Sequence, residues 1–500
     1  MYSAASNIEN TIATMCASEG HTWVTESMLR SKVSFRGMDM LISSGKVCCS
    51  KKDNDYVFTL PSYKDKEEEI AIKILGLLTT GVPDVQKETV DCLVREYEAK
   101  SGGALDIKQK EAVEMAARNR FCVLTGGPGT GKTFTLNAID YALRHLDTRG
   151  SIMYTAPTGK AARRIAESTG NKAYTLHKVL KITQDNLSPS TVYANIITVD
   201  EVSMLDVDVA CALFDGLMPN ARLILVGDVD QLPSVGPGAI LRDLILSGIV
   251  PVTKLLKTFR QKGESLIIDN MKNIRDGIQH LDVGKDFIIT RPAEIQGHYD
   301  NESFLLGCYI AKARQYGIDD VALLTPYRQV KYNTGADHMN NVIQAAINHS
   351  VKGLSDHGVK FLLNDRVMQL ENRKECANGD VGKIVEVGAK GITVQYIDGT
   401  VDYESKNLNQ LSLAYALSVH KSQGSEYKAV ISCMLNEHAA MLQRNLLYTA
   451  VTRAKKDFIL LGDDEAIRTA INNEASCKRI TMLQERLKQA AAYYGYKQTA

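Results

Sequence analysis

The chain has 500 residues and a mass of 55.0 kDa, the length of about three domains of roughly 150 residues each. It is 44% hydrophobic and 23% charged, a composition typical of proteins with ordinary buried cores. Lys and Arg total 59 against 58 Asp and Glu, which gives a net charge of +1. Any binding of nucleic acid must therefore come from local grooves, because the field of the whole molecule is near zero.

Membrane and secretory classes are excluded next. No stretch reaches the roughly 18 uncharged apolar residues of a membrane span, and the N-terminus lacks a basic segment followed by an apolar run. The ten cysteines are scattered without a C-x-x-C pair, which disfavours both a disulfide framework and a zinc site. We expect a cytoplasmic protein with reduced cysteines and no membrane partner.

The N-terminal region has its own pattern. Residues 1–100 hold 12 Lys and Arg against 15 Asp and Glu. A helical signal at Val24–Leu29 is followed by a polar tip at Lys51–Asp55 and an alternating run at Tyr56–Pro61, the outline of a winged helix. The acidic balance fits equally well a packing module that never touches nucleic acid. We assign residues 1–104 to an N-terminal accessory domain.

From residue 120 onward, short apolar runs alternate with stretches of helical period, as in parallel sheets covered on both faces. The series is too long for one sheet, so we expect two α/β domains, over residues 105–262 and 263–500. The expected strands are Phe121–Thr125, Ile152–Ala156, Asn195–Val199, Arg222–Val226, Pro251–Leu255, Val321–Leu324, Ala429–Leu435 and Phe458–Leu461. The expected helices include Lys160–Glu167, Val207–Leu217 and Gly238–Leu246.

Residues 357–412 have a different sequence pattern. Three short alternating runs, at Asp365–Leu370, Gly382–Val387 and Ile392–Tyr396, are separated by Asn-Gly and Asp-Gly turn signals. This pattern predicts a small β-barrel inserted into the second α/β domain.

A glycine-rich segment follows the first expected strand and fits G-x-x-x-x-G-K-[ST]. Its residues are Gly126, Gly127, Pro128, Gly129, Thr130, Gly131, Lys132 and Thr133. The glycines let backbone N–H groups surround a β-phosphate at the N-terminus of a helix expected over Phe134–Leu146. Lys132 supplies charge to the β- and γ-phosphates and Thr133 a hydroxyl ligand for Mg²⁺. We expect ATP and Mg²⁺ as cofactors.

Two further strand ends carry polar residues suited to this chemistry. Asp200 and Glu201 end an apolar run, where Asp200 would hold Mg²⁺ and Glu201 would orient and deprotonate the attacking water. Gln231 follows the next expected strand, and ligands of open α/β sheets gather at carboxyl ends of strands. We therefore expect Gln231 near the γ-phosphate, although a simple polar loop is the alternative there.

In content and order, these motifs resemble those of the RecD-like family, superfamily 1 DNA helicases that move 5′→3′. The resemblance covers about residues 105–465. Its segments are Asp106–Gln109, the P-loop 126–133, Ala156–Ala162, Thr175–His177, Asp200–Met204, Gly227–Val235, Thr258–Gln261, Val419–Glu426 and Tyr448–Ala454. It implies two RecA-like motor domains, an SH3-like barrel for the insertion, and a strand-separating pin at about residues 181–194, which we expect to be a small hairpin.

The resemblance also implies roles for individual residues. Gln109 would read adenine, and Arg260 and Arg453 would approach the γ-phosphate from across the cleft between the motor domains. The residues implied for single-stranded DNA are Pro157, Thr158, Lys160, Thr175, His177, Thr325, Pro326, His420 and Ser422. Tyr327 fits base stacking and core packing equally, and the two histidines fit ordinary satisfied side chains as well.

The function implied is an ATP-dependent DNA helicase that acts on single strands and duplex junctions as a monomer, with a protein loading partner, in DNA repair, recombination or replication. A single-stranded DNA translocase with DNA-stimulated ATPase and little unwinding is the alternative. A DNA-binding adaptor with a degenerate ATPase is disfavoured by Lys132, Glu201, Gln231 and Arg453. The residues do not distinguish an RNA track from a DNA track.

Overall fold

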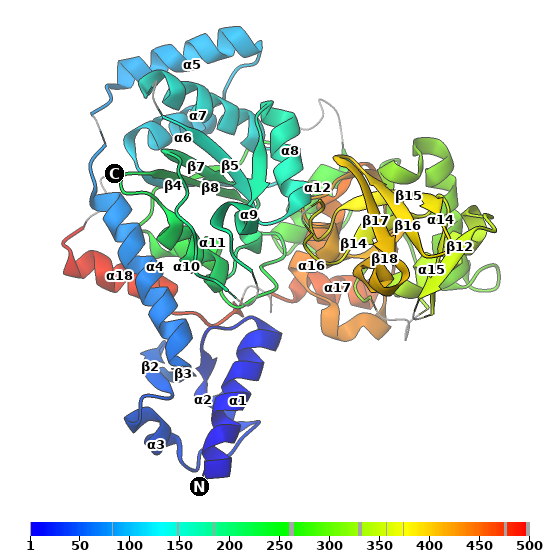
Figure 1. Ribbon diagram of the computed structural model, residues 1–500, viewed down its shortest axis with the longest axis horizontal. Helices are drawn as coiled ribbons and strands as arrows, with labels where there is room; N and C mark the ends of the chain where they lie inside the picture. The colour runs from blue at the N-terminus through cyan, green and yellow to red at the C-terminus, as the bar shows by residue number, and fades with distance from the viewer. Residues whose placement is uncertain are drawn as a thin grey trace.

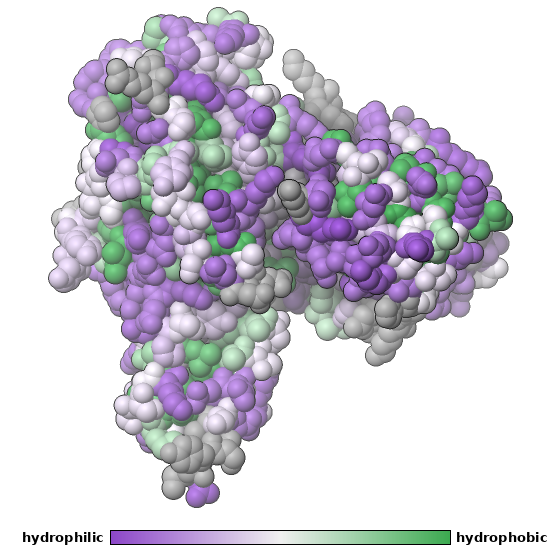
Figure 2. Space-filling model, viewed as in Figure 1, coloured by the Kyte–Doolittle hydropathy of each residue, from purple (hydrophilic) through white to green (hydrophobic). Residues whose placement is uncertain are grey.

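The computed structural model describes residues 2–82, 84–147, 150–183, 186–259, 265–328, 333–356, 358–373, 375–474 and 478–496. Two parallel sheets lie side by side, a small N-terminal unit extends from the first, and an antiparallel sheet lies on the outer side of the second (Figure 1). None of the described helices is both long enough and apolar enough to cross a membrane. Figure 2 shows hydrophilic residues over most of the face in view, with apolar residues in small scattered groups.

The first α/β unit is built on a six-stranded parallel sheet in the order β6-β5-β7-β8-β4-β9. Its strands are β4 (Phe121–Gly126), β5 (Ile152–Ala156), β6 (Ala173–Thr175), β7 (Ile196–Val199), β8 (Arg222–Gly227) and β9 (Val252–Leu255). Successive side chains of a strand point to opposite faces, so Val123 and Leu124 lie in different cores. Apolar residues on both faces explain why these strands are continuous apolar runs.

Helices cover both faces of this sheet. They are α6 (Ile107–Arg118), α7 (Lys132–Leu146), α8 (Gly159–Thr169), α9 (Leu176–Leu180), η1 (Val202–Met204), α10 (Val207–Gly216) and α11 (Ile240–Ser247). The predicted helices at 160–167, 207–217 and 238–246 correspond to α8, α10 and α11. Each expected strand is present within two residues at its ends, except that the strand expected at 458–461 begins four residues earlier, at Ala454.

The second α/β unit has a five-stranded parallel sheet in the order β10-β21-β20-β11-β19. Its strands are β10 (Phe287–Thr290), β11 (Val321–Thr325), β19 (Ala416–Ser418), β20 (Tyr427–Met434) and β21 (Ala454–Gly462). Its helical segments are α12 (Leu266–Arg275), α13 (Pro292–Ile295), α14 (Asn301–Tyr316), η2 (Ile318–Asp320), α15 (Ala336–Ile347), η4 (Val419–Ser422), η5 (Asn436–Met441), α16 (Arg444–Thr452) and α17 (Asp464–Asn472).

Between α15 and β19 the chain forms an antiparallel sheet in the order β17-β16-β15-β14-β18. Its elements are β14 (Arg366–Gln369), β15 (Val381–Val387), β16 (Gly391–Tyr396), β17 (Gly399–Glu404), η3 (Ser405–Gln410) and β18 (Leu411–Leu413), preceded by a hairpin of β12 (Gly353–Asp356) and β13 (Val359–Leu362). The three predicted strands are β14 to β16. Ile384 and Val394 share one core with Leu323 and Ile431, so the insertion sheet packs on one face of the second parallel sheet.

The N-terminal unit comprises α1 (Tyr2–Glu19), β1 (Val24–Thr25), α2 (Glu26–Arg30), α3 (Met38–Ser43), β2 (Cys48–Lys52) and β3 (Asp55–Thr59). Its antiparallel sheet has the order β1-β3-β2 around a separate small core. Asp53 and Asn54 form the two-residue turn between β2 and β3, with φ of 47° and 71°. Asp and Asn tolerate this left-handed conformation better than most residues, which explains the hairpin at this point.

The units do not follow the boundaries that we expected. Helices α4 (Pro61–Thr79) and α5 (Lys87–Ser101) lie within the expected accessory domain but pack on the first sheet, as Ile74 and Val94 show. Helix α18 (Leu483–Tyr493), expected in the second unit, also returns to the first unit. Its apolar stripe of Leu483, Leu487 and Ala491 fills the space beside α4 and α11.

The segment 181–194, expected to be a hairpin pin, has no internal strand pairing among its described residues, 181–183 and 186–194. Val192 instead pairs with Leu217 in an isolated bridge, and the amide of Ser190 donates to the carbonyl of Leu180 over 2.8 Å. Ile182 and Val192 are buried in the first core. The apolar side chains therefore tie this loop to the body of the first unit rather than to each other.

A buried carboxylate holds the N-terminal unit, α4 and the C-terminal segment together. Glu67 accepts hydrogen bonds from the hydroxyl of Thr22 (2.6 Å), the indole N–H of Trp23 (2.8 Å) and the amide of Met482 (3.1 Å). Only 1% of Glu67 is exposed, and burial raises its pKa to about 7. The junction therefore contains a carboxylate that titrates near neutral pH.

We predict that Glu67→Gln changes the pH dependence of stability. The folded pKa of about 7 lies above the ordinary value of 4.5, so the carboxyl binds a proton on folding between these values. As pH rises from about 4.5 through about 7, the free energy of unfolding of the wild type should fall by on the order of 3 kcal/mol relative to that of Glu67→Gln. Urea unfolding across this range measures the difference, with Glu69→Gln on the exposed side of α4 as control. Parallel curves for wild type and Glu67→Gln would contradict the prediction.

Candidate functional site

The P-loop lies between the end of β4 and the start of α7. Gly129 and Gly131 have φ of 72° and 80°, a conformation that favours glycine. A Cβ on Gly131 would lie 2.5 Å from the side-chain nitrogen of Gln109. The ammonium group of Lys132 donates to the carbonyls of Gly126 (2.6 Å) and Gly127 (3.1 Å). A helix N-terminus and a lysine charge thus meet at one loop, the arrangement that binds phosphate.

Gln109 braces this loop. Its side-chain oxygen accepts from the amide of Asp106 (3.0 Å), its nitrogen donates to the carbonyl of Thr130 (3.3 Å), and 1% of the residue is exposed. The adenine contact assigned to Gln109 stays a prediction. On the other side of the loop, the amide of Phe259 donates to the carbonyl of Gly129 over 2.7 Å. Arg260, the next residue, lies outside the described residues.

Two acidic residues follow the end of β7, which lies between β5 and β8 in the first sheet. The amide of Glu201 donates to a carboxylate oxygen of Asp200 over 2.8 Å, and Glu201 has the left-handed φ of 55°, which is costly for a residue with a Cβ. Burial and the carboxylate of Glu201 raise the pKa of Asp200 to about 6, while the charge of Lys132 lowers it. Asp200 therefore lies within electrostatic range of the P-loop lysine. The hydroxyl of Thr133, in the first turn of α7, and the carboxylate of Asp200 are hard oxygen ligands of the kind that Mg²⁺ prefers, and their joint Mg²⁺ site stays a prediction.

Gln231 joins the two α/β units. Its nitrogen donates to Asp228 (3.2 Å), and its oxygen accepts from the guanidinium of Arg453 (2.9 Å), which follows α16. The hydroxyl of Tyr448, on α16, also donates to Asp228 over 3.1 Å and lies 3.1 Å from the Cβ that Gly127 lacks. A chain of hydrogen bonds therefore runs from Tyr448, which lies close to the P-loop backbone, through Asp228 and Gln231 to Arg453. Sequence reasoning assigned no role to Asp228 or Tyr448, although both stand inside the quoted motifs.

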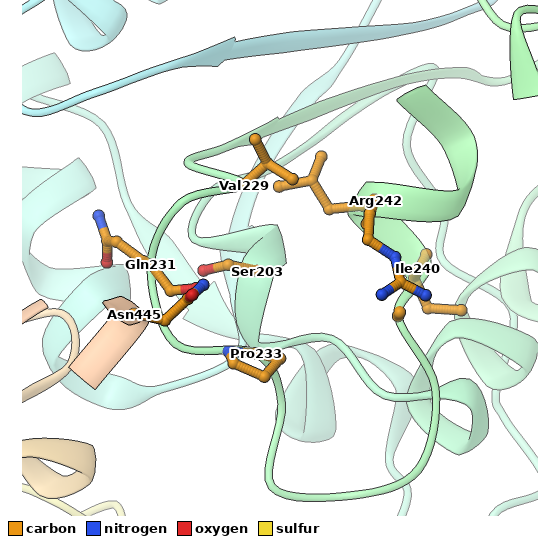
Figure 3. A pocket seen from close by; sticks show the side chains of 9 residues that line it. Ser203, Val229, Gln231, Pro233, Ile240, Arg242 and Asn445 are labelled. Atoms are coloured by element: carbon orange, nitrogen blue, oxygen red, sulfur yellow. The ribbon is translucent and has the colours of Figure 1, made fainter. Parts of the chain in front are cut away.

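A small pocket of about 40 Å³ lies behind this contact. Figure 3 shows Gln231 and Asn445 beside each other, with Ser203 and Arg242 lining the same pocket. The side chain of Asn445 donates to the carbonyl of Gln231 over 2.9 Å. The pocket therefore separates the loop after β8 from α11, and its lining includes a residue of the second unit.

The residues implied for DNA in the first unit stand at helix starts. The hydroxyls of Thr158 and Thr175 cap α8 and α9 by accepting from amides three residues on, each over 3.3 Å. Burial lowers the pKa of His177 and of Lys160. Pro157 precedes the α8 cap. Each cap satisfies one amide of its helix, and the other amides of the first turn have no partner within the helix.

The residues implied in the second unit are more enclosed. Thr325 donates its hydroxyl to the carbonyl of Tyr327 (2.6 Å) and Ser422 to that of Val419 (2.7 Å), and both are 0% exposed. Burial, and then the charge of Arg479, lower the pKa of His420. Pro326 is buried as well. The structure brings one pair of these motifs together, because a Cβ on Gly424 would lie 3.3 Å from the hydroxyl of Thr158.

Ion pairs that sequence reasoning missed connect α8 to the second unit. Arg163 contacts Asp380 (2.7 Å) and Asp398 (2.9 Å) of the insertion sheet region, and Arg164 contacts Glu426 (2.8 Å). The two arginines follow the predicted DNA motif directly, so their position was a signal, but their partners lie more than 200 residues away.

Several known proteins are similar to this chain in sequence. Residues 109–237 match the model of an AAA domain, and residues 413–461 match that of a UvrD-like helicase C-terminal domain. The ATP-dependent RecD2 DNA helicase of Deinococcus radiodurans is 33% identical over 432 residues, which cover 85% of this chain and 58% of that protein. The RecBCD enzyme subunit RecD of Mycobacterium tuberculosis is 29% identical over 481 residues, which cover 84% and 79%.

The chain thus spans less than two thirds of the RecD2 relative. Among solved structures, Pif1 helicase from Bacteroides in complex with ADP-AlF3 and ssDNA superposes with a TM-score of 0.47 at 19% identity, covering 79% of this chain and 99% of that one.

We predict that Lys132→Ala weakens binding of a fluorescent ATP analogue by about 10- to 100-fold, the loss of a charged hydrogen-bond donor to phosphate. Among the residues that the structure describes, the ammonium donates to carbonyls of its own loop, so the unfolding midpoint should stay near that of wild type. A fluorescence titration measures the affinity. Lys172→Ala, an exposed lysine of the same unit, serves as control. Equal affinities of wild type and Lys132→Ala would refute the assignment.

Proposed function

We propose that the chain is a RecD-like superfamily 1 helicase, an ATP-dependent DNA helicase that moves 5′→3′ on single-stranded DNA. The observation that carries the proposal is the 2.9 Å contact of Arg453 with Gln231. This contact joins a cation of one RecA-like domain to Gln231 of the other. An ATPase whose site is completed by a second domain can convert hydrolysis into motion.

The hydrolytic step follows from the site residues. Lys132 and the P-loop amides would hold the β- and γ-phosphates, while Thr133 and Asp200 would hold Mg²⁺, which supplies charge neutralisation when bound. Glu201 would accept a proton from the attacking water. The water oxygen would bond to the γ-phosphorus while the bond between that phosphorus and the β–γ bridging oxygen breaks. Gln231, Arg453 and Arg260 would stabilise the negative charge of the transition state.

Motion would follow from the contacts between the units. An arginine that reaches a nucleotide in trans contributes about 10³–10⁵ in rate, so hydrolysis would be fast only with the units apposed. The side chain of Gln231 is hydrogen-bonded to both units, to Asp228 in its own unit and to Arg453 in the other. Nucleotide release would free the units to separate, and alternating grips would move the protein along the strand.

We propose that the strand lies across the helix starts of both units. Thr158 and Thr175 accept through their hydroxyl oxygens as caps, so their hydroxyl protons would be left for a phosphate oxygen. Thr325 and Ser422 donate their hydroxyls internally, so nearby backbone amides would serve in the second unit. Such contacts bind the backbone without reading sequence. The insertion sheet would be the SH3-like cover of this track, and residues 2–60 a winged-helix-like module. These modules define our domain proposal together with the two motors.

One observation favours a second candidate, a translocase with little unwinding. The described residues of segment 181–194 lack the strand pairing of a hairpin, so the wedge that would split a duplex is a loop held on the first core. Each base-pair step costs about 1.4 kcal/mol to melt, and a loop wedge would have to withstand that load.

We predict unwinding of a duplex with a 5′ single-stranded tail, in the presence of ATP and Mg²⁺, and none with a 3′ tail. Strand release followed by gel or fluorescence measures it, with Lys132→Ala as the inactive control. Release from the 3′ tail alone would overturn the polarity. ATP hydrolysis stimulated by DNA without strand release on either substrate would establish the translocase instead.

We predict that Glu201→Gln binds ATP as wild type does but hydrolyses it about 10²- to 10⁴-fold more slowly, the range for loss of a general base. Phosphate release at saturating ATP and DNA measures the rate. Glu167→Gln, an exposed carboxylate of α8, provides the matched control and should keep full activity. Normal turnover in Glu201→Gln would show that another group takes the proton.

A further inference from the structure

The described residues 478–482, here called the C-terminal strap, run between the N-terminal unit and the first motor. The carbonyl of Ile480 accepts from the amides of Thr22 (3.0 Å) and Trp23 (3.1 Å), and its amide donates to a ring nitrogen of His21 (2.9 Å). On the other side, Arg242 of α11 donates to the carbonyl of Arg479 over 2.8 Å. The strap is therefore fixed by hydrogen bonds to both neighbours.

The side chain of Arg479 extends into the turn formed by residues 234–238. One terminal nitrogen donates to the hydroxyl of Ser234 (2.9 Å) and to the carbonyls of Gly236 (2.9 Å) and Gly238 (2.8 Å), and the other donates to the carbonyl of Ser234. Only a planar fork of donors reaches several carbonyls of one turn at once. Burial lowers the pKa of Arg479 to about 10, so the group stays charged at neutral pH.

The N-terminal unit makes room for this guanidinium. A Cβ on Gly20 would lie 2.3 Å from the central carbon of Arg479, and Gly20 has a φ of +75°. The carbonyl of Gly20 accepts from the amide of Gly238 over 2.9 Å. The turn at 234–238 is thus held by the strap and by the N-terminal unit together.

The same turn continues the loop that carries Gln231. The second motor binds the start of that loop at Leu232, whose amide donates to Thr449 (2.9 Å) and whose carbonyl accepts from Gln423 (3.0 Å). Arg479 binds the loop two residues later, at Ser234. The charge of Arg479 also reaches His420, a residue implied for DNA, whose pKa it lowers. Arg479 therefore stands where the ATP loop, the second motor and the N-terminal unit meet.

We propose that Arg479 is a positioning residue of the motor, which holds the 234–238 turn and thereby places Gln231 against Arg453 for DNA-stimulated ATP hydrolysis. The inference rests on the proposed function. It differs from a role in fixing the C-terminus alone, because the side-chain hydrogen bonds of Arg479 all end on the turn, whereas the backbone of the strap makes the anchoring contacts.

The test compares Arg479→Ala, Arg479→Lys and Arg486→Ala in the full chain. Arg486 lies on α18, 3.5 Å from Glu68 and 5.8 Å from the ring of Trp23, and anchors the same segment through other partners. We expect Arg479→Ala to lower kcat of DNA-stimulated hydrolysis about tenfold with KM for ATP unchanged, since misplacement of a positioned group costs rate. Arg479→Lys should recover only part of kcat, because an ammonium lacks the fork. Arg486→Ala should keep kcat.

Each outcome is decisive. Unfolding curves and binding of a fluorescent ATP analogue establish that the variants fold, and Arg479→Lys provides the measurement if Arg479→Ala does not. Wild-type kcat in the folded Arg479 variants, or an equal fall in Arg486→Ala, would overturn the positioning role while leaving the helicase function standing. A wild-type protein without DNA-stimulated hydrolysis would overturn the proposed function and this inference with it.

Discussion

The arrangement of the molecule depends on one buried amide, the side chain of Gln231. A buried amide must find partners for both its nitrogen and its oxygen, and these partners lie in different units, Asp228 in one and Arg453 in the other. Asp228 is itself buried, which raises its pKa, and Tyr448 of the second unit donates to it. In this arrangement buried polar groups of the two units satisfy one another directly, so the contact holds the units together at Gln231.

The same region stores strain that the surrounding cores offset. Glu201 adopts a left-handed conformation, and burial beside Glu201 raises the pKa of Asp200 to about 6. A strained non-glycine residue costs about 1–3 kcal/mol and persists where neighbouring structure fixes it. Here β7 supplies that structure, because Ile197 and Val199 are anchored in one core and Ile196 in the other. The rigid strand holds two like charges at its end, opposite Lys132, where a divalent cation and a polyphosphate would relieve their repulsion.

Sequence pattern predicted most of the strands because both sheets are buried on two faces, so each strand is an uninterrupted apolar run; β5 matches residue for residue. The motifs also predicted that Lys132, Asp200 and Gln231 lie near one another, since they follow strands that end at one edge of the first sheet. Arg453 contacts Gln231 from the other unit, as the resemblance implied by assigning it to the far side of the cleft. The pattern did not predict where α18 packs. The stripe of Leu483, Leu487 and Ala491 predicts that one face of the helix packs against apolar residues, but it does not indicate which part of the chain supplies them. The hairpin at 181–194 was expected from the resemblance alone, and the pattern did not predict that Ile182 and Val192 pack in the first core.

The return of the C-terminus changes how the N-terminal unit is connected to the motor. Residues 2–60 enter the first unit through α4, and the strap pairs with Thr22 and Trp23 from the far end of the chain. Glu67 then bonds Thr22, Trp23 and Met482 at once, which closes a loop of more than 400 residues at a single carboxylate. A displacement of the N-terminal unit must therefore move the strap or break buried hydrogen bonds. Since the strap carries Arg479, such a displacement acts on the turn that follows Gln231.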